Sequence, residues 1–69
     1  MREWLKSLRI EKGYTLKEMG EKLRISESYY AMIESGDRQK KMDLTLASGL
    51  SVILGISVAE IIALEQGRR

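Results

Sequence analysis

Carboxylates, hydroxyls and basic side chains are the groups that could do ionic chemistry in this chain, because it contains neither histidine nor cysteine. Ser-His-Asp and Cys-His nucleophiles and zinc-dependent hydrolysis each need a residue type that is missing. Disulfides and thiolate metal sites are excluded for the same reason. No pair of acids is placed to face one pocket. We therefore expect a protein that is not an enzyme and uses no metal or other cofactor.

Charge is divided unevenly along the 69 residues. The net charge is +2, but residues 1–42 carry ten Lys and Arg against seven Asp and Glu, whereas residues 43–69 carry two against three. A basic region favours a polyanionic partner. The uncharged segment 44–59 is interrupted by Ser, Thr and Gly, so it offers no apolar stretch long enough for a membrane span. Charged residues likewise break any N-terminal signal peptide, and we expect a cytoplasmic protein without membrane contact.

Capping sequences predict where helices begin. Thr15 follows a glycine and an apolar residue and precedes Glu18 by three positions, which predicts a capping box. The same pattern recurs at Ser57 and Glu60. The other predicted N-caps are Ser26 and Asp43. The expected helices are residues 2–12, 16–23, 27–35, 44–54 and 58–65. At this length they form one all-α domain, a compact five-helix unit over residues 1–69.

Apolar periodicity gives each predicted helix one buried face. The residues expected in the core are Trp4, Leu5, Leu8, Met19, Leu23, Ile25, Tyr30, Ile33, Leu46, Ala47, Leu50, Ile53, Leu54, Val58, Ile61 and Ile62. Only residues 24–26 separate the second helix from the third, which forces a sharp crossing between them. Gly20 supplies the small residue that such a close approach requires.

The outward face of the predicted helix 27–35 is small and uncharged. At 100° per residue it consists of Ser28, Ala31, Met32 and Ser35. A helix in the major groove of DNA prefers short side chains, because they let its backbone approach the base edges. An ordinary solvated helix would normally carry lysines and glutamates here, although a plain surface is the alternative. The pattern favours double-stranded DNA as the partner.

Short motifs extend over nearly the whole chain: Leu5 to Arg9, Gly13 to Thr15, Gly20, Arg24 to Ser26, Ile33 to Gly36 and Leu54 to Ser57. Together they resemble the lambda-repressor-like helix-turn-helix family, also called the Cro/Xre type. The resemblance implies a helix-turn-helix core at residues 15–35 and C-terminal helices, 44–65, that complete the core and dimerise. The chain departs from the family pattern at Leu16, Arg24 and Glu27, where glutamine, glycine and a basic or amide residue are usual.

The resemblance also implies which residues contact DNA. The expected base-facing residues are Glu27, Ser28 and Met32. The expected phosphate-facing residues are Thr15, Lys17, Ser26, Tyr29, Ser35, Arg38, Lys40 and Lys41. Glu27 could accept a hydrogen bond from cytosine N4, and Met32 could pack on a thymine methyl. Glu27 is equally explained as a first-turn acid that favours the helix dipole, and the basic segment 38–41 as a solubilising loop.

Glu34 is predicted to point into the core, where an unpaired carboxylate would be costly. Arg9 flanks the apolar face of the first helix. The resemblance implies that the two side chains pair, so we expect a structural ion pair and no direct contact with bases.

Val52 and Leu64 lie outside the predicted core faces, and the resemblance implies a homodimer through this region. A twofold dimer would set two recognition helices about 34 Å apart on DNA. We expect a transcriptional regulator, a repressor of the phage or mobile-element type, that occupies a palindromic operator, with no small-molecule ligand evident. The alternative is a protein-interaction module, such as an antitoxin, that uses the same fold.

Overall fold

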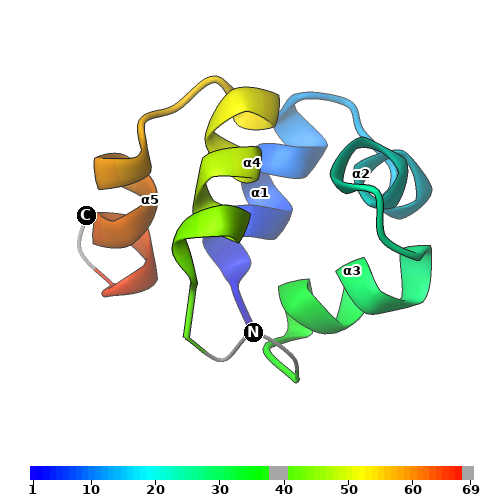
Figure 1. Ribbon diagram of the computed structural model, residues 1–69, viewed down its shortest axis with the longest axis horizontal. Helices are drawn as coiled ribbons and strands as arrows, with labels where there is room; N and C mark the ends of the chain where they lie inside the picture. The colour runs from blue at the N-terminus through cyan, green and yellow to red at the C-terminus, as the bar shows by residue number, and fades with distance from the viewer. Residues whose placement is uncertain (38–40, 68–69) are drawn as a thin grey trace.

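The computed structural model describes residues 1–37 and 41–67, which form an all-α domain of five helices. The helices are α1 (Glu3–Glu11), α2 (Leu16–Leu23), α3 (Glu27–Ser35), α4 (Leu44–Leu54) and α5 (Val58–Glu65). Four of them have the predicted bounds, and α1 is one residue shorter at each end. Figure 1 shows α5 on one side of α4 and the α2–α3 pair on the other.

Side chains cap four of the helices as the sequence predicts. Thr15 Oγ1 accepts a hydrogen bond from Glu18 N at 3.0 Å, and Thr15 N donates to Glu18 Oε1 at 2.8 Å, which completes the capping box of α2. Ser57 accepts from the amide of Glu60, but no return bond from that carboxylate forms within the described chain. The predicted N-cap at Ser57 is therefore confirmed, but the capping box that pairs it with Glu60 is wrong. The other two N-cap side chains each accept a hydrogen bond from the backbone amide three residues later: Ser26 from Tyr29 and Asp43 from Leu46.

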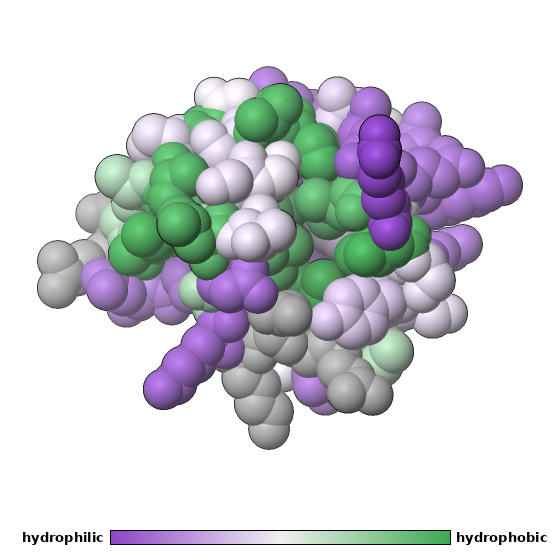
Figure 2. Space-filling model, viewed as in Figure 1, coloured by the Kyte–Doolittle hydropathy of each residue, from purple (hydrophilic) through white to green (hydrophobic). Residues whose placement is uncertain are grey.

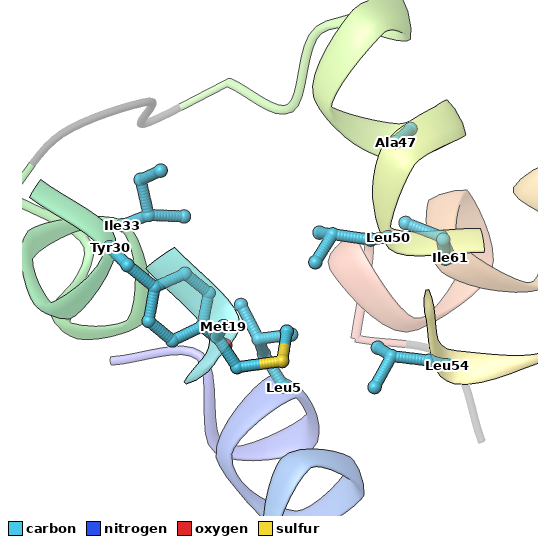
Figure 3. Close-up of a cluster of buried hydrophobic side chains, with 8 residues drawn as sticks. All are labelled: Leu5, Met19, Tyr30, Ile33, Ala47, Leu50, Leu54 and Ile61. Carbon is cyan, nitrogen blue, oxygen red and sulfur yellow. The ribbon is translucent and has the colours of Figure 1, made fainter. Parts of the chain in front are cut away.

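All five helices contribute to one core. Figure 3 shows the buried side chains, which are Leu5, Met19, Tyr30, Ile33, Ala47, Leu50, Leu54 and Ile61. Full burial of a side chain of this size stabilises the folded state by about 1.5–3 kcal/mol. Every one of these residues lies on a face that the apolar periodicity predicts to be inward.

Ile62 is a wrong core prediction, since it is 46% exposed. The inward direction of α5 is centred on Ile61 and Glu65, which are four residues apart and so share a face. Ile62 lies about 100° from Ile61, at the edge of that face. Apolar periodicity alone does not show this orientation, because Glu65 is charged and faces the protein only through its contact with Arg2.

Arg2 joins the two ends of the described chain. Its side chain is 7% exposed and binds the Glu65 carboxylate through Nε at 2.9 Å and Nη2 at 2.8 Å. Its Nη1 donates to the carbonyl of Ile33, and its backbone N donates to the carbonyl of Glu34 at 2.8 Å. The indole of Trp4 donates to the same Glu65 carboxylate at 3.1 Å. One arginine thus connects α1, the last turn of α3 and the last turn of α5.

Over the residues that the structure describes, no single helix combines the length and the apolar character needed to cross a membrane. Helices α4 and α5 pass that test only as a pair, across a bend of 112°.

Gly20 is the point of closest approach between α2 and the chain that leads into α3. A Cβ there would lie 2.9 Å from the carbonyl oxygen of Ile25 and 3.1 Å from the amide nitrogen of Glu27, both backbone atoms. A Cβ at Gly49 would meet only the end of the Leu23 side chain, at 3.0 Å. The backbone cannot yield as a side chain can, so the two helical glycines differ in what alanine would do.

We predict that Gly20→Ala lowers the free energy of unfolding by about 1–3 kcal/mol, because overpacking outweighs the gain in helix propensity. Gly49→Ala is the matched control, with the same gain in propensity and a neighbour that can move. Urea denaturation followed by far-ultraviolet circular dichroism measures both. Equal stability changes in the two variants would contradict the assignment of the close approach to Gly20.

Candidate functional site

The predicted outward face of α3 is only partly exposed. Ser28 is exposed, whereas Ala31, Met32 and Ser35 are half-buried. Ser28, Met32 and Ser35 are spaced by four and three residues and so share one side of the helix, opposite the buried Tyr30. Glu27 is exposed at the edge of this face, in the first turn. The first turn of α3 is therefore the part most available to an incoming surface.

Two hydroxyls near the N-termini of α2 and α3 keep a proton to donate. Thr15 Oγ1 and Ser26 Oγ each accept one backbone hydrogen bond, from the third residue of their helix. A hydroxyl that accepts one bond can still donate another. Both predicted phosphate-facing residues therefore remain able to donate to an anion.

Ser35 is placed differently. Its hydroxyl lies 3.0 Å from the carbonyl oxygen of Met32 and 3.1 Å from Oδ2 of Asp37, so its one proton is already shared within the end of α3. The Asp37 amide also donates back to Ser35 Oγ, at 3.4 Å. The carboxylate of Asp37 adds a negative charge beside it. This geometry makes Ser35 the least suited of the predicted phosphate-facing hydroxyls.

The predicted phosphate-binding cations are only partly described. Lys17 is exposed in the first turn of α2, and Lys41 is exposed just before α4. Arg38 and Lys40 lie outside the described residues. The departure from the family pattern at Leu16 has a structural counterpart, because this residue is half-buried and packs against the core. Its side chain supports α2 and offers no polar atom to a ligand.

Tyr29 is half-buried and lines an apolar cavity of about 200 Å³. The cavity lies between α3, the end of α2 and the start of α4, and its lining residues are Leu23, Ile25, Tyr29, Ile33, Asp43, Thr45 and Leu46. Figure 2 shows hydrophobic side chains over α4 and α5 and near the α2–α3 connection. Tyr29 therefore belongs as much to an apolar surface as to the predicted phosphate contacts.

The structure brings Arg9 and Glu34 together. Arg9 Nε lies 2.9 Å from Glu34 Oε2 and Arg9 Nη2 lies 3.1 Å from Oε1, a two-point contact, and Nη1 donates to the carbonyl of Tyr14 at 3.0 Å. The side chains are 12% and 5% exposed. The hydrogen bond with Glu34 raises the pKa of Arg9 above its usual value, against the opposing effect of burial. Both groups are turned away from the outer face of α3.

The other arginine–carboxylate contact was not predicted. Arg2 and Glu65 lie 63 positions apart, so no local spacing connects them. A signal was nevertheless present in α5, because Glu65 follows Val58 by seven residues and Ile61 by four. A charge at those spacings falls on the apolar face and predicts a buried partner.

Tyr30 places a hydroxyl inside the core. Its oxygen is buried and has no hydrogen-bond partner among the described residues. Burial raises the pKa of Tyr30 well above its usual value, and the nearby Glu34 carboxylate acts in the same direction. The folded protein therefore holds this phenol in its neutral form to higher pH than the unfolded chain does.

A family model described as helix-turn-helix matches residues 5–61. The uncharacterized HTH-type transcriptional regulator YqaF of Bacillus subtilis (strain 168) is 49% identical over 39 residues, which are 56% of this chain and 51% of that protein. The chain thus spans about half the length of the curated relative it matches. No solved structure matches significantly.

Removal of Arg9 is expected to destabilise the fold. Arg9→Met leaves the Glu34 carboxylate buried without its cation, and loss of one partner from such a pair costs about 3–5 kcal/mol. Thermal unfolding measures the effect, and the double variant Arg9→Met with Glu34→Leu should recover part of the loss. An unchanged melting temperature in the single variant would rule out a structural role for the pair.

Because the Tyr30 phenol is buried with a raised pKa, we predict that the free energy of unfolding falls at alkaline pH. Above a pH of about 10 the unfolded chain releases the Tyr30 proton and the folded protein retains it, so the free energy of unfolding falls by up to about 1.4 kcal/mol per pH unit. Tyr30→Phe removes this contribution and serves as the comparison, because it leaves every other titrating group in place. The difference in stability between the two proteins, measured by urea denaturation, should be constant below that pH and shift in favour of Tyr30→Phe above it. A constant difference across the whole range would contradict the prediction.

Proposed function

The chain belongs to the helix-turn-helix family, and from this premise we propose that it binds double-stranded DNA sequence-specifically and regulates transcription as a cytoplasmic protein. Family membership supports DNA-binding transcription regulation, and so does similarity to a protein named as an HTH-type transcriptional regulator. The observation that carries the proposal is the short, uncharged outer face of α3, held on a scaffold whose core comes from all five helices.

In the proposed complex α3 lies in the major groove, where base edges present distinct hydrogen-bonding patterns. Glu27 and Ser28 are exposed in the first turn of α3, with Met32 one turn further along the same helix. Glu27 accepts a hydrogen bond from cytosine N4, and Met32 packs on a thymine methyl. These three side chains would distinguish the bases, because they are the long or polar groups nearest the exposed first turn of α3, while Ala31 beside them is short and apolar.

The start of α2 supplies the proposed phosphate contact. The Thr15 side chain and the Glu18 carboxylate satisfy each other's backbone amides, which leaves the amides of Leu16 and Lys17 as free donors of the first turn. Amides at a helix N-terminus bind phosphate, and the exposed Lys17 adds a positive charge. The Thr15 hydroxyl and Lys17 thus complete an anion-binding end of α2 beside the groove.

A homodimer is proposed from the apolar surface of the C-terminal helices. Val52 on α4 is 83% exposed, and Ile62 on α5 is the most exposed of that helix's large apolar residues. Leu64, the other residue expected at the interface, is half-buried. A twofold dimer through this surface would present two copies of α3 to a palindromic operator. Occupancy of that operator is the proposed means of repression.

A second candidate function is docking on another protein, as an antitoxin does. The apolar cavity between α3 and α4 favours it, because such a cavity suits an apolar side chain better than a phosphate. Salt dependence separates the two functions. Affinity for DNA falls steeply with salt, by about 0.9 logarithmic units per phosphate contact for each tenfold rise in salt concentration, whereas apolar docking does not.

Selection of bound sequences from a random duplex pool tests the proposal. We expect enrichment of a palindrome. Glu27→Ala should change the preferred base at one position of each half-site and leave the salt dependence unchanged. Lys17→Ala should weaken binding to all sequences and make the slope against salt shallower by about one. Lys12→Ala, a change at the C-terminal end of α1 whose side chain lies near Gly55, is the control and should do neither. No enrichment at low salt would falsify DNA binding.

A further inference from the structure

Arg24 has a backbone conformation that arginine rarely adopts. It ends α2 with φ 61° and ψ 40°, the left-handed region, and its amide donates to the carbonyls of Gly20 and Glu21. The other positive φ values in the described chain belong to glycines, at Gly13, Gly36, Gly55 and Gly67. Glycine reaches this region without the steric cost that a Cβ imposes. Stability alone would therefore favour glycine at residue 24 as well.

Within the described residues, no contact of the Arg24 side chain offsets the steric cost of its backbone conformation. The side chain is exposed, and it forms no ion pair or hydrogen bond within residues 1–37 and 41–67. The other two arginines of this part of the chain are both paired, Arg9 with the buried carboxylate of Glu34 and Arg2 with the half-buried carboxylate of Glu65. A strained position that persists without a local benefit points to a functional role.

The position of Arg24 identifies what the guanidinium could bind. It lies in the connection that leads into α3, two residues before the N-cap Ser26 and three before Glu27. Helix α3 itself carries no basic residue, and its first turn carries an acid. A helix that enters the major groove is flanked by phosphates, so a cationic contact near the N-terminus of α3 has to come from a neighbouring segment, and Arg24 lies in the segment that leads directly into this helix. Arginine suits this task because its planar guanidinium binds phosphate through two hydrogen bonds.

We propose that Arg24 contacts a DNA phosphate beside the N-terminus of α3, and that the strained backbone is retained for this contact. The proposal rests on the proposed function, since it assigns a further contact in the same DNA interface. It also accounts for the departure of this position from the glycine usual in the family. Arginine costs backbone strain that glycine would avoid, but it places a positive charge beside α3, which carries no basic residue.

Three substitutions at Arg24 distinguish the effect of backbone strain from the effect of the positive charge. Arg24→Gly removes both the strain and the charge, Arg24→Asn removes the charge and tolerates the left-handed region, and Arg24→Lys keeps both. We expect Arg24→Gly to raise the melting temperature by about 4–8 °C. We also expect it to weaken binding to a fluorescently labelled duplex of mixed sequence by about tenfold at 0.1 M salt, with a salt slope shallower by about one.

Arg24→Asn should weaken binding as Arg24→Gly does, and Arg24→Lys should keep most of the affinity and the slope. Lys12→Ala removes an exposed cation at the C-terminal end of α1, near Gly55, and should leave affinity within twofold. If Arg24→Gly binds with unchanged affinity and slope, or melts at a lower temperature than the parent protein, the inference is overturned. Failure of the parent protein to bind any duplex would overturn the proposed function instead, and the two failures are thereby distinguishable.

Discussion

The last turn of α3 is held by two arginines, and the direction of the outer face of α3 depends on them. Arg9 binds the buried carboxylate of Glu34, and Arg2 binds the carbonyls of Ile33 and Glu34 while pairing with Glu65. The final carbonyls of a helix lack partners within the helix. Here two of them accept hydrogen bonds from the start of the chain. Helix α3 is thereby fixed against α1 at its C-terminal end, and its first turn is left exposed.

The helix boundaries could be predicted because their determinants are local. Thr15, Ser26, Asp43 and Ser57 each bind the amide three residues onward, so a few positions decide where each helix begins. What the sequence could not show depends on long-range packing. The inward side of α5 carries both the buried Ile61 and the Glu65 carboxylate that binds Arg2, 63 positions away, and Ile62 lies at its exposed edge.

The candidate site also has features that local sequence predicts and features that depend on the rest of the fold. Which residues of α3 face outward follows from helical geometry, because Tyr30, Ile33 and Glu34 fix the inward side. Whether a hydroxyl is available for a ligand depends on the fold of the neighbouring chain. The resemblance predicts that Ser35 faces a phosphate, yet the turn after α3 brings the Asp37 carboxylate within hydrogen-bonding distance of its hydroxyl. The DNA contacts themselves stay predictions, because they depend on a partner as well as on this chain.

The contact between Trp4 and Glu65 gives the molecule an optical signature. Trp4 is the chain's single tryptophan, and its indole donates to a carboxylate that also binds Arg2. Its emission therefore originates at the seam between α1 and α5, far along the chain from the helix-turn-helix pair. Separation of α5 from α1 would expose the indole to water and shift that emission to longer wavelength, even if α2 and α3 kept their packing. The fluorescence of this protein is accordingly a local report on the attachment of its C-terminal helix.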